Sequence, residues 1–227
     1  QIPVAGRNSR GRPVVNLLPL DEGERISSIL PVEEYSADKF VLMATANGTV
    51  KKTSLDQYSR PRSVGLRAVD LVEDDYLVGT AIIDDGSDVM LFSSEGKAVR
   101  FASTDARAMG RVSKGVRGMR LPEGQKVIAM VIPEDEGYLL TVCQNGYGKR
   151  TKVEEFDTKG RGGKGMIAIQ ASERNGPLVG TTQLFVGDEI MLISDQGTMV
   201  RTRGDEVSVV GRNTQGVRII RLKENEN

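Results

Sequence analysis

The segment Lys159-Gly160-Arg161-Gly162-Gly163-Lys164-Gly165 is a run of glycines and cations, and a short apolar stretch follows it directly. Its frame, two glycines with four residues between them, recurs at 6–11, 110–115 and 211–216. Residues 60–65 form a fifth copy, in which arginine replaces the first glycine. The closing glycines of the five copies are spaced by 54, 50, 50 and 51 residues. A regular period near fifty residues indicates an array of one supersecondary unit.

Each repeat predicts the same succession of β-strands. In the second repeat, strands at 39–45 and 50–53 are joined by Ala46-Asn47-Gly48-Thr49, whose Asn-Gly pair is typical of a type I′ hairpin turn. Two more strands, at 66–72 and 76–83, follow the glycine-framed loop. The corresponding strands are predicted at 13–18 and 25–31 in the truncated first repeat; at 89–93, 97–101, 116–121 and 126–132 in the third; at 138–143, 147–153, 166–170 and 178–185 in the fourth; and at 190–194, 198–202 and 217–222 in the fifth.

Helices are not expected, because no segment keeps apolar residues at helical spacing over three turns. Four antiparallel strands in each period of about fifty residues predict an all-β fold, a propeller-like ring or spiral of four-stranded blades. We expect one domain that covers residues 1–227. Its blades are predicted at 1–37 (partial), 38–86, 87–136, 137–187 and 188–227.

Composition argues against several classes of function. The chain has no histidine and no tryptophan, and aromatic residues make up 4% of it. Histidine is the commonest general base and metal ligand, so we expect no catalytic residue, no metal site and no cofactor. The acidic turns Glu73-Asp74-Asp75 and Glu134-Asp135-Glu136 lack the spacing of a Ca²⁺ loop.

The sequence also bears on the cellular compartment. No apolar run approaches the roughly 18 residues that a membrane span needs, and residues 1–16 contain no signal-peptide core. The single cysteine, Cys143, cannot form an internal disulfide and is predicted to be a core residue, which fits a reducing cytoplasm. Because the sequence begins without methionine, we expect it to be a fragment of a longer chain.

Positive charge is concentrated at one place in the repeat. The formal net charge is zero, but the windows 7–12, 51–67, 97–120, 149–164 and 201–221 hold 26 of the 31 lysines and arginines and only 7 of the 31 acids. An array of blades would align these windows along one basic edge. Such an edge fits a polyanion with a regular charge spacing, and duplex DNA is the obvious candidate.

The expected DNA contacts involve the phosphate backbone, so we expect binding that is largely independent of sequence and strongly dependent on salt. Glycines in the loops would let backbone N–H groups approach phosphate oxygens. A cation also lies four residues after each hairpin-turn glycine. The predicted DNA-binding residues are Arg7, Arg10, Arg12, Lys51, Lys52, Arg60, Arg62, Arg67, Arg100, Arg107, Arg111, Lys114, Arg117, Arg120, Lys149, Arg150, Lys159, Arg161, Lys164, Arg201, Arg203, Arg212 and Arg218.

Two nucleotide-binding motifs are matched only formally. Residues 160–165 fit Gly-x-Gly-x-x-Gly, and the repeated frame resembles half of a P-loop. The dinucleotide motif requires a helix after the loop, whereas a strand-like stretch follows here, and no copy continues into Gly-Lys-Ser/Thr. We therefore reject both motifs.

Several long stretches resemble the C-terminal domain of the A subunit of bacterial DNA gyrase, and the resemblance covers the whole chain. The stretches are 11–20 (GRPVVNLLPL), 43–53 (MATANGTVKKT), 144–151 (QNGYGKRT) and 210–217 (VGRNTQGV). The family's signature heptad is Gln-Arg-Arg-Gly-Gly-Lys-Gly in its first blade. Residues 159–165 match five of its seven positions, but in a later blade.

The resemblance implies a β-pinwheel, a propeller-like disc whose blades exchange strands and around whose rim DNA is bent and wrapped to direct strand passage and negative supercoiling. It implies two partners, the rest of the gyrase A subunit and the gyrase B subunit. It also implies that the protein acts on DNA in the bacterial cytoplasm, associated with the nucleoid. The catalytic tyrosine of this ATP-dependent type IIA topoisomerase follows an arginine in another domain. No tyrosine of this chain follows an arginine, so we expect no DNA cleavage by it.

Other interpretations remain open at this stage. The corresponding domain of topoisomerase IV has a similar fold and lacks the signature heptad. A propeller that serves as a protein-interaction scaffold could share a period near fifty, but the Gly-Gln-Leu-Gly signature of one such repeat family is absent here. A propeller enzyme is a third interpretation, and the missing histidine counts against it.

Overall fold

The structure, a computed structural model, describes residues 4–223 and 226–227. Short strands dominate these residues, and none of their helices is long and apolar enough to cross a membrane. The strands are β1 (Lys39–Thr45), β2 (Thr49–Ser54), β3 (Leu77–Asp84), β4 (Asp88–Ser93), β5 (Lys97–Ala102), β6 (Val116–Arg117), β7 (Val127–Val131), β8 (Tyr138–Cys143), β9 (Tyr147–Lys152), β10 (Met166–Ile167), β11 (Leu178–Leu184), β12 (Glu189–Ile193), β13 (Met199–Arg203) and β14 (Val217–Arg218). The 3-10 turns are η1 (Val14–Asn16), η2 (Leu55–Tyr58), η3 (Ser103–Asp105), η4 (Val153–Glu155) and η5 (Gly204–Glu206).

The strands form three four-stranded antiparallel sheets and a two-stranded one. Their orders are β3-β1-β2-β6, β7-β4-β5-β10 and β11-β8-β9-β14, followed by the hairpin β12-β13. In each four-stranded sheet, one outer strand comes from the next repeat of the sequence. The all-β fold with exchanged strands is therefore confirmed, whereas the exact blade boundaries stay a prediction.

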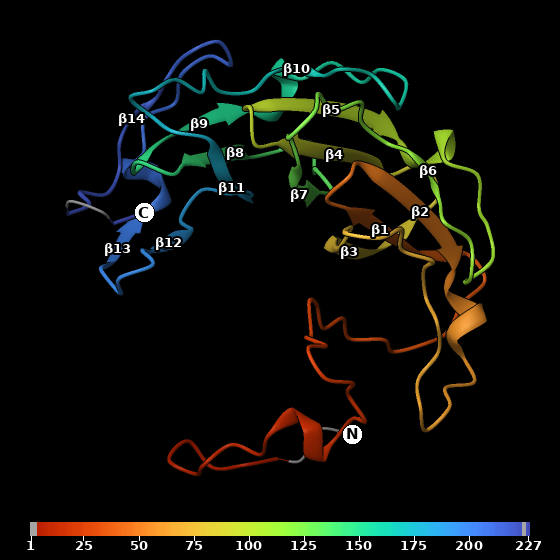
Figure 1. Cartoon of the computed structure of the whole chain (residues 1–227). Helices are drawn as coiled ribbons and strands as arrows, with labels where there is room; N and C mark the ends of the chain where they lie inside the picture. Colours follow the sequence, from red (N-terminus) through yellow and green to blue (C-terminus); the bar gives the residue numbers. More distant parts are fainter. Residues whose placement is uncertain (1–3, 224–225) are drawn as a thin grey trace.

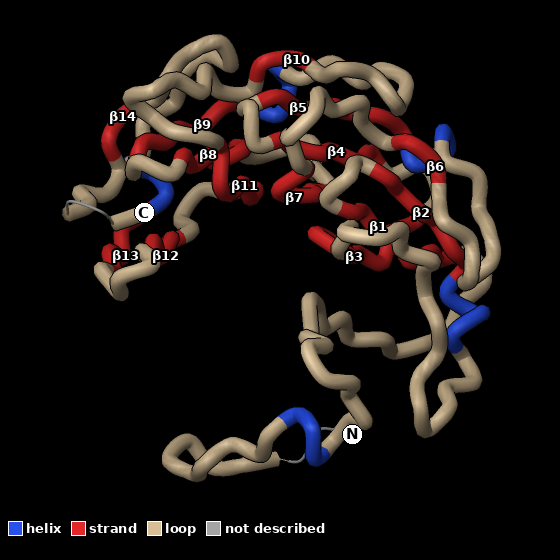
Figure 2. The backbone as a smooth tube through the Cα atoms, in the orientation of Figure 1, coloured by secondary structure: helices blue, strands red, loops and turns tan. Residues whose placement is uncertain are grey.

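The sheets follow one another along an arc (Figure 1). Strands β3, β7 and β11 lie on its inner side, and the exchanged strands β6, β10 and β14 lie on its outer side. The loops 110–115, 160–165 and 211–216 run along the same outer edge, as the tan segments of the tube show (Figure 2), whereas the N-terminal segment that contains the loop 6–11, red in Figure 1, lies apart from the sheets. The repeat thus places equivalent loops at equivalent positions of one convex edge.

Three of the predicted strands are wrong: 13–18, 25–31 and 66–72 form no strand in the structure. The observed pairings give the reason. A strand equivalent to 13–18 or 66–72 pairs with the hairpin of the preceding repeat, and a strand equivalent to 25–31 pairs with the hairpin of its own repeat. Each of these would need a hairpin in or before the first repeat, and residues 4–38 contain no strand.

Apolar side chains between neighbouring sheets make up the core. One cluster joins the first two sheets and includes Leu42, Leu91 and Phe101. A second joins the next two, where the rings of Phe92 and Phe156 meet edge to face with centroids 6.4 Å apart. Because each cluster is shared by two repeats, a single repeat cannot bury its own apolar face.

The hairpin-turn glycines are the closest contacts between repeats. The carbonyl oxygen of Gly48 accepts hydrogen bonds from the backbone N–H groups of Gly118 and Met119 in the next repeat. Gly96 and Gly146 bind the equivalent pairs 168–169 and 219–220 in the same way. These bonds end the exchanged strands after two residues, which is why β6, β10 and β14 are shorter than predicted.

Substitution of Gly146 tests this contact, with Gly197 as a matched control. Both have positive φ, 79° and 85°, so alanine at either position costs about 1–2 kcal/mol of backbone strain. A Cβ at Gly146 would lie 2.5 Å from the carbonyl oxygen of Ile220, whereas one at Gly197 would meet nothing within 4 Å. Denaturant titration should show that Gly146→Ala lowers the free energy of unfolding by about 1–3 kcal/mol more than Gly197→Ala. Equal losses would contradict the contact.

Candidate nucleic-acid interface

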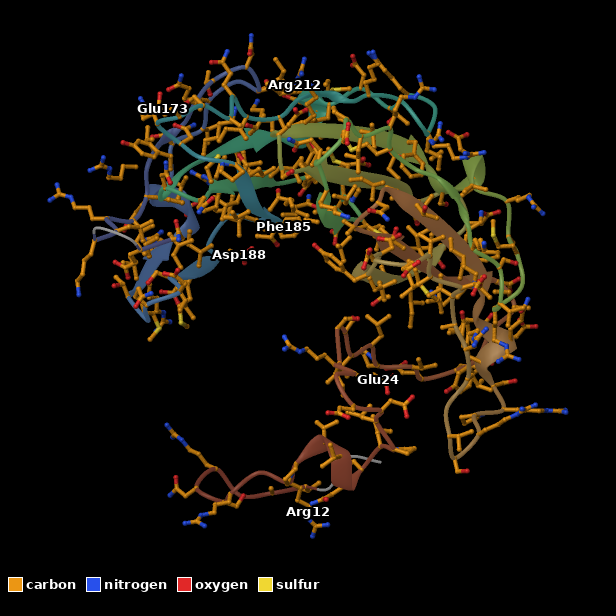
Figure 3. All side chains as sticks on the ribbon, in the orientation of Figure 1. Arg12, Glu24, Glu173, Phe185, Asp188 and Arg212 are labelled. Atoms are coloured by element: carbon orange, nitrogen blue, oxygen red, sulfur yellow. The ribbon has the colours of Figure 1, made fainter. Side chains whose placement is uncertain are left out.

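The predicted DNA-binding cations differ in exposure: most are exposed, three are intermediate and four are buried. Arg100, Arg111 and Arg212 are intermediate, and Lys51, Lys52, Lys149 and Arg150 are buried. Arg212 lies on the outer side of the arc, while Phe185 and Asp188 lie on the inner side (Figure 3). The exposed cations are Arg7, Arg10, Arg12, Arg60, Arg62, Arg67, Arg107, Lys114, Arg117, Arg120, Lys159, Arg161, Lys164, Arg201, Arg203 and Arg218.

The surface position predicted for the four buried cations is wrong. Lys51, Lys52, Lys149 and Arg150 keep at most 6% of their surface exposed. Their strands, β2 and β9, are central strands of their sheets. Only the first two residues of each pair with β6 or β14, and at the cations the glycine-framed loop of the next repeat and the residues just before it lie against the strand. These four side chains cannot reach DNA and instead bind neighbouring backbone.

The cation four residues after each turn glycine binds the 3-10 turn of the next repeat. Lys52 Nζ donates to the carbonyl oxygen of Ser103 at 3.0 Å. Arg100 Nη1 donates to the carbonyl oxygens of Val153 and Phe156 at 3.3 and 3.1 Å. One sequence position thus makes the same contact across successive junctions between repeats.

Arg150 repeats the contact at the next junction. Its Nε donates to the carbonyl oxygen of Val207 at 2.8 Å, and its Nη2 donates to that of Asp205 at 3.0 Å. The charge is balanced by the Asp205 carboxylate, 3.3 Å from Nη1. Arg201 is the equivalent residue of the last repeat, and in the described structure its exposed side chain pairs only with Glu189.

Backbone hydrogen bonds reinforce these junctions. The carbonyl oxygens of Lys52, Arg100 and Arg150 accept from the backbone N–H groups of Met109, Lys159 and Val210, at 2.9, 2.8 and 3.0 Å. Each donor directly precedes the first glycine of a glycine-framed loop. The cation positions therefore fix where the loops begin on the outer edge.

The closing glycines of the loops have a packing role that the sequence did not predict. A Cβ at Gly115, Gly165 or Gly216 would lie 2.5–2.8 Å from a backbone carbonyl oxygen of the preceding hairpin. Their missing side chain therefore faces protein. A Cβ at the opening glycines Gly110 and Gly160 would meet nothing within 4 Å, so close approach by phosphate is sterically open there.

In two loops, the arginine after the first glycine binds the repeat before it. Arg161 donates to the carbonyl oxygens of Asp105 and Arg117 at 2.8 and 3.0 Å, and the equivalent Arg212 donates to that of Ile167 at 2.9 Å. By contrast, Lys114 and Lys164 are exposed, and no hydrogen bond or ion pair within the described structure involves their ammonium groups. They are the clearest surface cations of the loops.

Sequence reasoning missed one arginine of this surface. The exposed guanidinium of Arg174 lies 4.4 Å from the ring centroid of Tyr147, and that of Arg218 lies 5.2 Å from the same ring. Arg218 also donates to the Tyr147 hydroxyl at 2.7 Å. Arg174 stands outside the cation-rich windows, so charge counting gave no signal for it.

Sheets that exchange their outer strands along an arc define a propeller-like β-pinwheel domain, here with cationic loops on its outer edge. A family model described as "DNA gyrase C-terminal domain, beta-propeller" matches residues 1–33, 39–84, 87–134, 137–182 and 188–227. The chain belongs to this family.

Relatives and solved structures agree with this assignment. The chain is 55% identical to the DNA gyrase A subunit of Salmonella typhimurium and 54% identical to that of Escherichia coli, over 100% of the chain and 26% of each relative. It thus spans about a quarter of the length of these relatives. A solved DNA gyrase A C-terminal domain matches 95% of this chain and 72% of its own, with a TM-score of 0.84 at 27% identity. A topoisomerase IV C-terminal domain matches 95% and 68%, with a TM-score of 0.88 at 25% identity.

The pair Arg150→Gln and Arg201→Gln tests the contact between the arginine and the next 3-10 turn. Arg150→Gln leaves backbone carbonyls and Asp205 without their buried partner, so the free energy of unfolding should fall by about 3 kcal/mol or more. Arg201→Gln removes the same charge from an exposed equivalent position and should change it by no more than about 0.5 kcal/mol. Thermal and denaturant unfolding would measure both. Similar small effects would show that the buried arginine does not hold the repeats together.

Proposed function

We propose that the chain is the DNA-wrapping part of the gyrase A subunit, and that duplex DNA lies along the convex edge of the arc. The observation that carries the proposal is the repetition of exposed cations on the outer loops. Lys114 and Lys164 occupy equivalent positions of two successive repeats, and an arginine precedes each of them by three residues. Duplex DNA carries a similarly regular line of charge.

The positions of the acidic residues support DNA binding on one face of the molecule only. A surface hollow lined by Asp135, Glu136 and Glu154 lies beside the 3-10 turn η4, and only Lys152 contributes a cation to its lining. Acidic groups there would repel a phosphate backbone. DNA is therefore confined to the loops, where cations outnumber acids.

Contacts of this kind bind without reading sequence, because side chains and loop amides reach phosphates and not base edges. Smooth bending of 20–30 base pairs costs on the order of 1–6 kcal/mol. Many weak phosphate contacts must together offset this bending free energy, and the cations that repeat along the edge supply those contacts. The expected binding is therefore cooperative along the arc and sensitive to salt.

In the longer protein, the bent DNA would present a neighbouring segment for strand passage and favour negative supercoiling. The partners would be the rest of the gyrase A subunit and the gyrase B subunit, in the bacterial cytoplasm at the nucleoid. DNA cleavage and ATP hydrolysis would belong to other parts of the enzyme. Topoisomerase IV is the alternative, since the fold matches both, but the high sequence identity to the gyrase A subunit favours gyrase.

Salt dependence of DNA binding tests the assignment of the outer edge. The double variant Lys114→Gln/Lys164→Gln removes two edge charges, and the slope of log K against log salt should flatten by roughly 0.9 for each phosphate contact removed. The control Lys39→Gln/Lys152→Gln removes the same charge from exposed lysines that pair with Asp84 and Glu154, and its slope should stay unchanged. Equal slopes for the two variants would overturn the proposed edge.

A further inference from the structure

Lysine alternates with valine at a position that faces the outer loops. Three residues after the turn glycines stand Lys51, Val99, Lys149 and Val200, which pair with Met43, Leu91, Thr141 and Leu192 in their hairpins. The four are therefore structurally equivalent positions of successive repeats. Two supply a long side chain with an ammonium group, and two supply no hydrogen-bond donor.

Both lysines are anchored inside the loop of the next repeat. Lys51 Nζ donates to the carbonyl oxygens of Arg111 at 2.6 Å and Ala68 at 2.5 Å, and to Thr53 Oγ1 at 3.0 Å. An ammonium group has three N–H donors, so all of them are used. Arg111 belongs to the loop 110–115, so the Arg111 carbonyl group of this loop points toward the protein interior.

Lys149 repeats this arrangement two repeats later. Its Nζ donates to the carbonyl oxygens of Gly211 and Arg212 at 2.7 and 2.5 Å, and to Thr214 Oγ1 at 3.1 Å. Burial lowers the pKa of both ammonium groups to about 8, and a neighbouring arginine, Arg111 or Arg212, acts in the same direction, while Glu155 raises that of Lys149. Such buried ammonium groups are retained at a cost in desolvation, which marks them as specific anchors.

The loop 159–165 has no lysine anchor and is held by its own backbone instead. The N–H group of Gly162 donates to the carbonyl oxygen of Gly118 at 2.6 Å, and the carbonyl oxygen of Gly163 accepts from the N–H group of Arg120 at 2.8 Å. Val99 takes the lysine position, and a cavity of about 230 Å³ lies between it and the loop, lined also by Arg100, Lys159, Gly160 and Lys164. Glycine occupies four positions of the frame 160–165, against two in 110–115 and two in 211–216. This loop therefore has a glycine-rich backbone and space behind it, and hydrogen bonds to the preceding repeat take the place of a buried lysine.

We propose that Lys51 and Lys149 are positioning residues for DNA binding, which set two outer loops in their binding shape, while hydrogen bonds to the preceding repeat set the loop 159–165. This rests on the proposed function. Neither lysine touches DNA, because both are buried. An anchored loop loses little freedom on binding, whereas an unanchored loop must lose it at that moment.

Trypsin gives a DNA-free test, because Lys114 and Lys164 are equivalent, exposed and each followed by glycine. Lys51→Met should raise the rate of cleavage after Lys114 about tenfold and leave the rate after Lys164 unchanged, since a hydrogen bond to a charged group shifts a local opening equilibrium by at least that factor. Lys149→Met should raise the rate of cleavage after Arg212 in the same way. An unchanged rate at the loop that lost its lysine would overturn the proposal, and so would an equal rise after Lys164, which would show general loosening.

DNA affinity separates positioning from direct contact. Lys51→Met should weaken DNA binding severalfold while the salt slope stays unchanged, because every phosphate contact remains. Unchanged affinity with faster cleavage would show a purely structural lysine, and a slope that fell by about 0.9 would show a direct contact. Either result would overturn the proposal. Failure of the wild-type chain to bind DNA would instead sink the proposed function, and the trypsin rates would still report on the anchors.

Discussion

The junction between repeats is the constraint on which the rest of the structure depends. At each junction a turn-glycine carbonyl accepts two backbone N–H groups from the next repeat, and a cation four residues later binds the next 3-10 turn. The exchanged strand then pairs with the strand that carries this cation. Neighbouring sheets therefore have one relative placement, and the arc is the result of repeating it.

This constraint determines which positive charges remain for DNA. Cations on β2 and β9 are used within the protein, because they are buried and carbonyl groups of the next repeat accept their hydrogen bonds. Lys114, Arg161 and Lys164 in the glycine-framed loops stay exposed on the outer edge. The formal net charge of zero thus hides two separate uses of lysine and arginine, one that joins repeats and one that is available to phosphates.

Much of the fold could be predicted from the sequence, because its period repeats both turns and charges. The Asn47-Gly48 turn and the strands on either side of it lie where predicted, but the predicted type I′ turn is wrong, because Gly48 has positive φ and Asn47 does not. The prediction of a strand at 66–72 is wrong because the local sequence pattern does not show whether a pairing partner exists elsewhere in the chain. Lys51 and Arg150 were misplaced for a related reason: a cationic strand looks like an exposed edge until the strand from the next repeat is known.

The glycines show the same limit. Counting them located every loop, but not which way each glycine faces. The closing glycines Gly115, Gly165 and Gly216 pack against the preceding hairpin, whereas a Cβ at the opening glycines Gly110 and Gly160 would meet nothing within 4 Å. The period of the sequence thus shows where the glycines lie along the chain. Which side of each glycine faces protein depends on the neighbouring repeat.

The central claim is that the convex edge bends duplex DNA with one handedness. Its most direct test is the linking number of relaxed circular DNA that a ligase seals in the presence of the chain. The account predicts a shift of one sign that grows with bound protein and shrinks in high salt, as phosphate binding weakens. An unchanged linking number at saturating protein would contradict wrapping and leave a surface that only binds DNA.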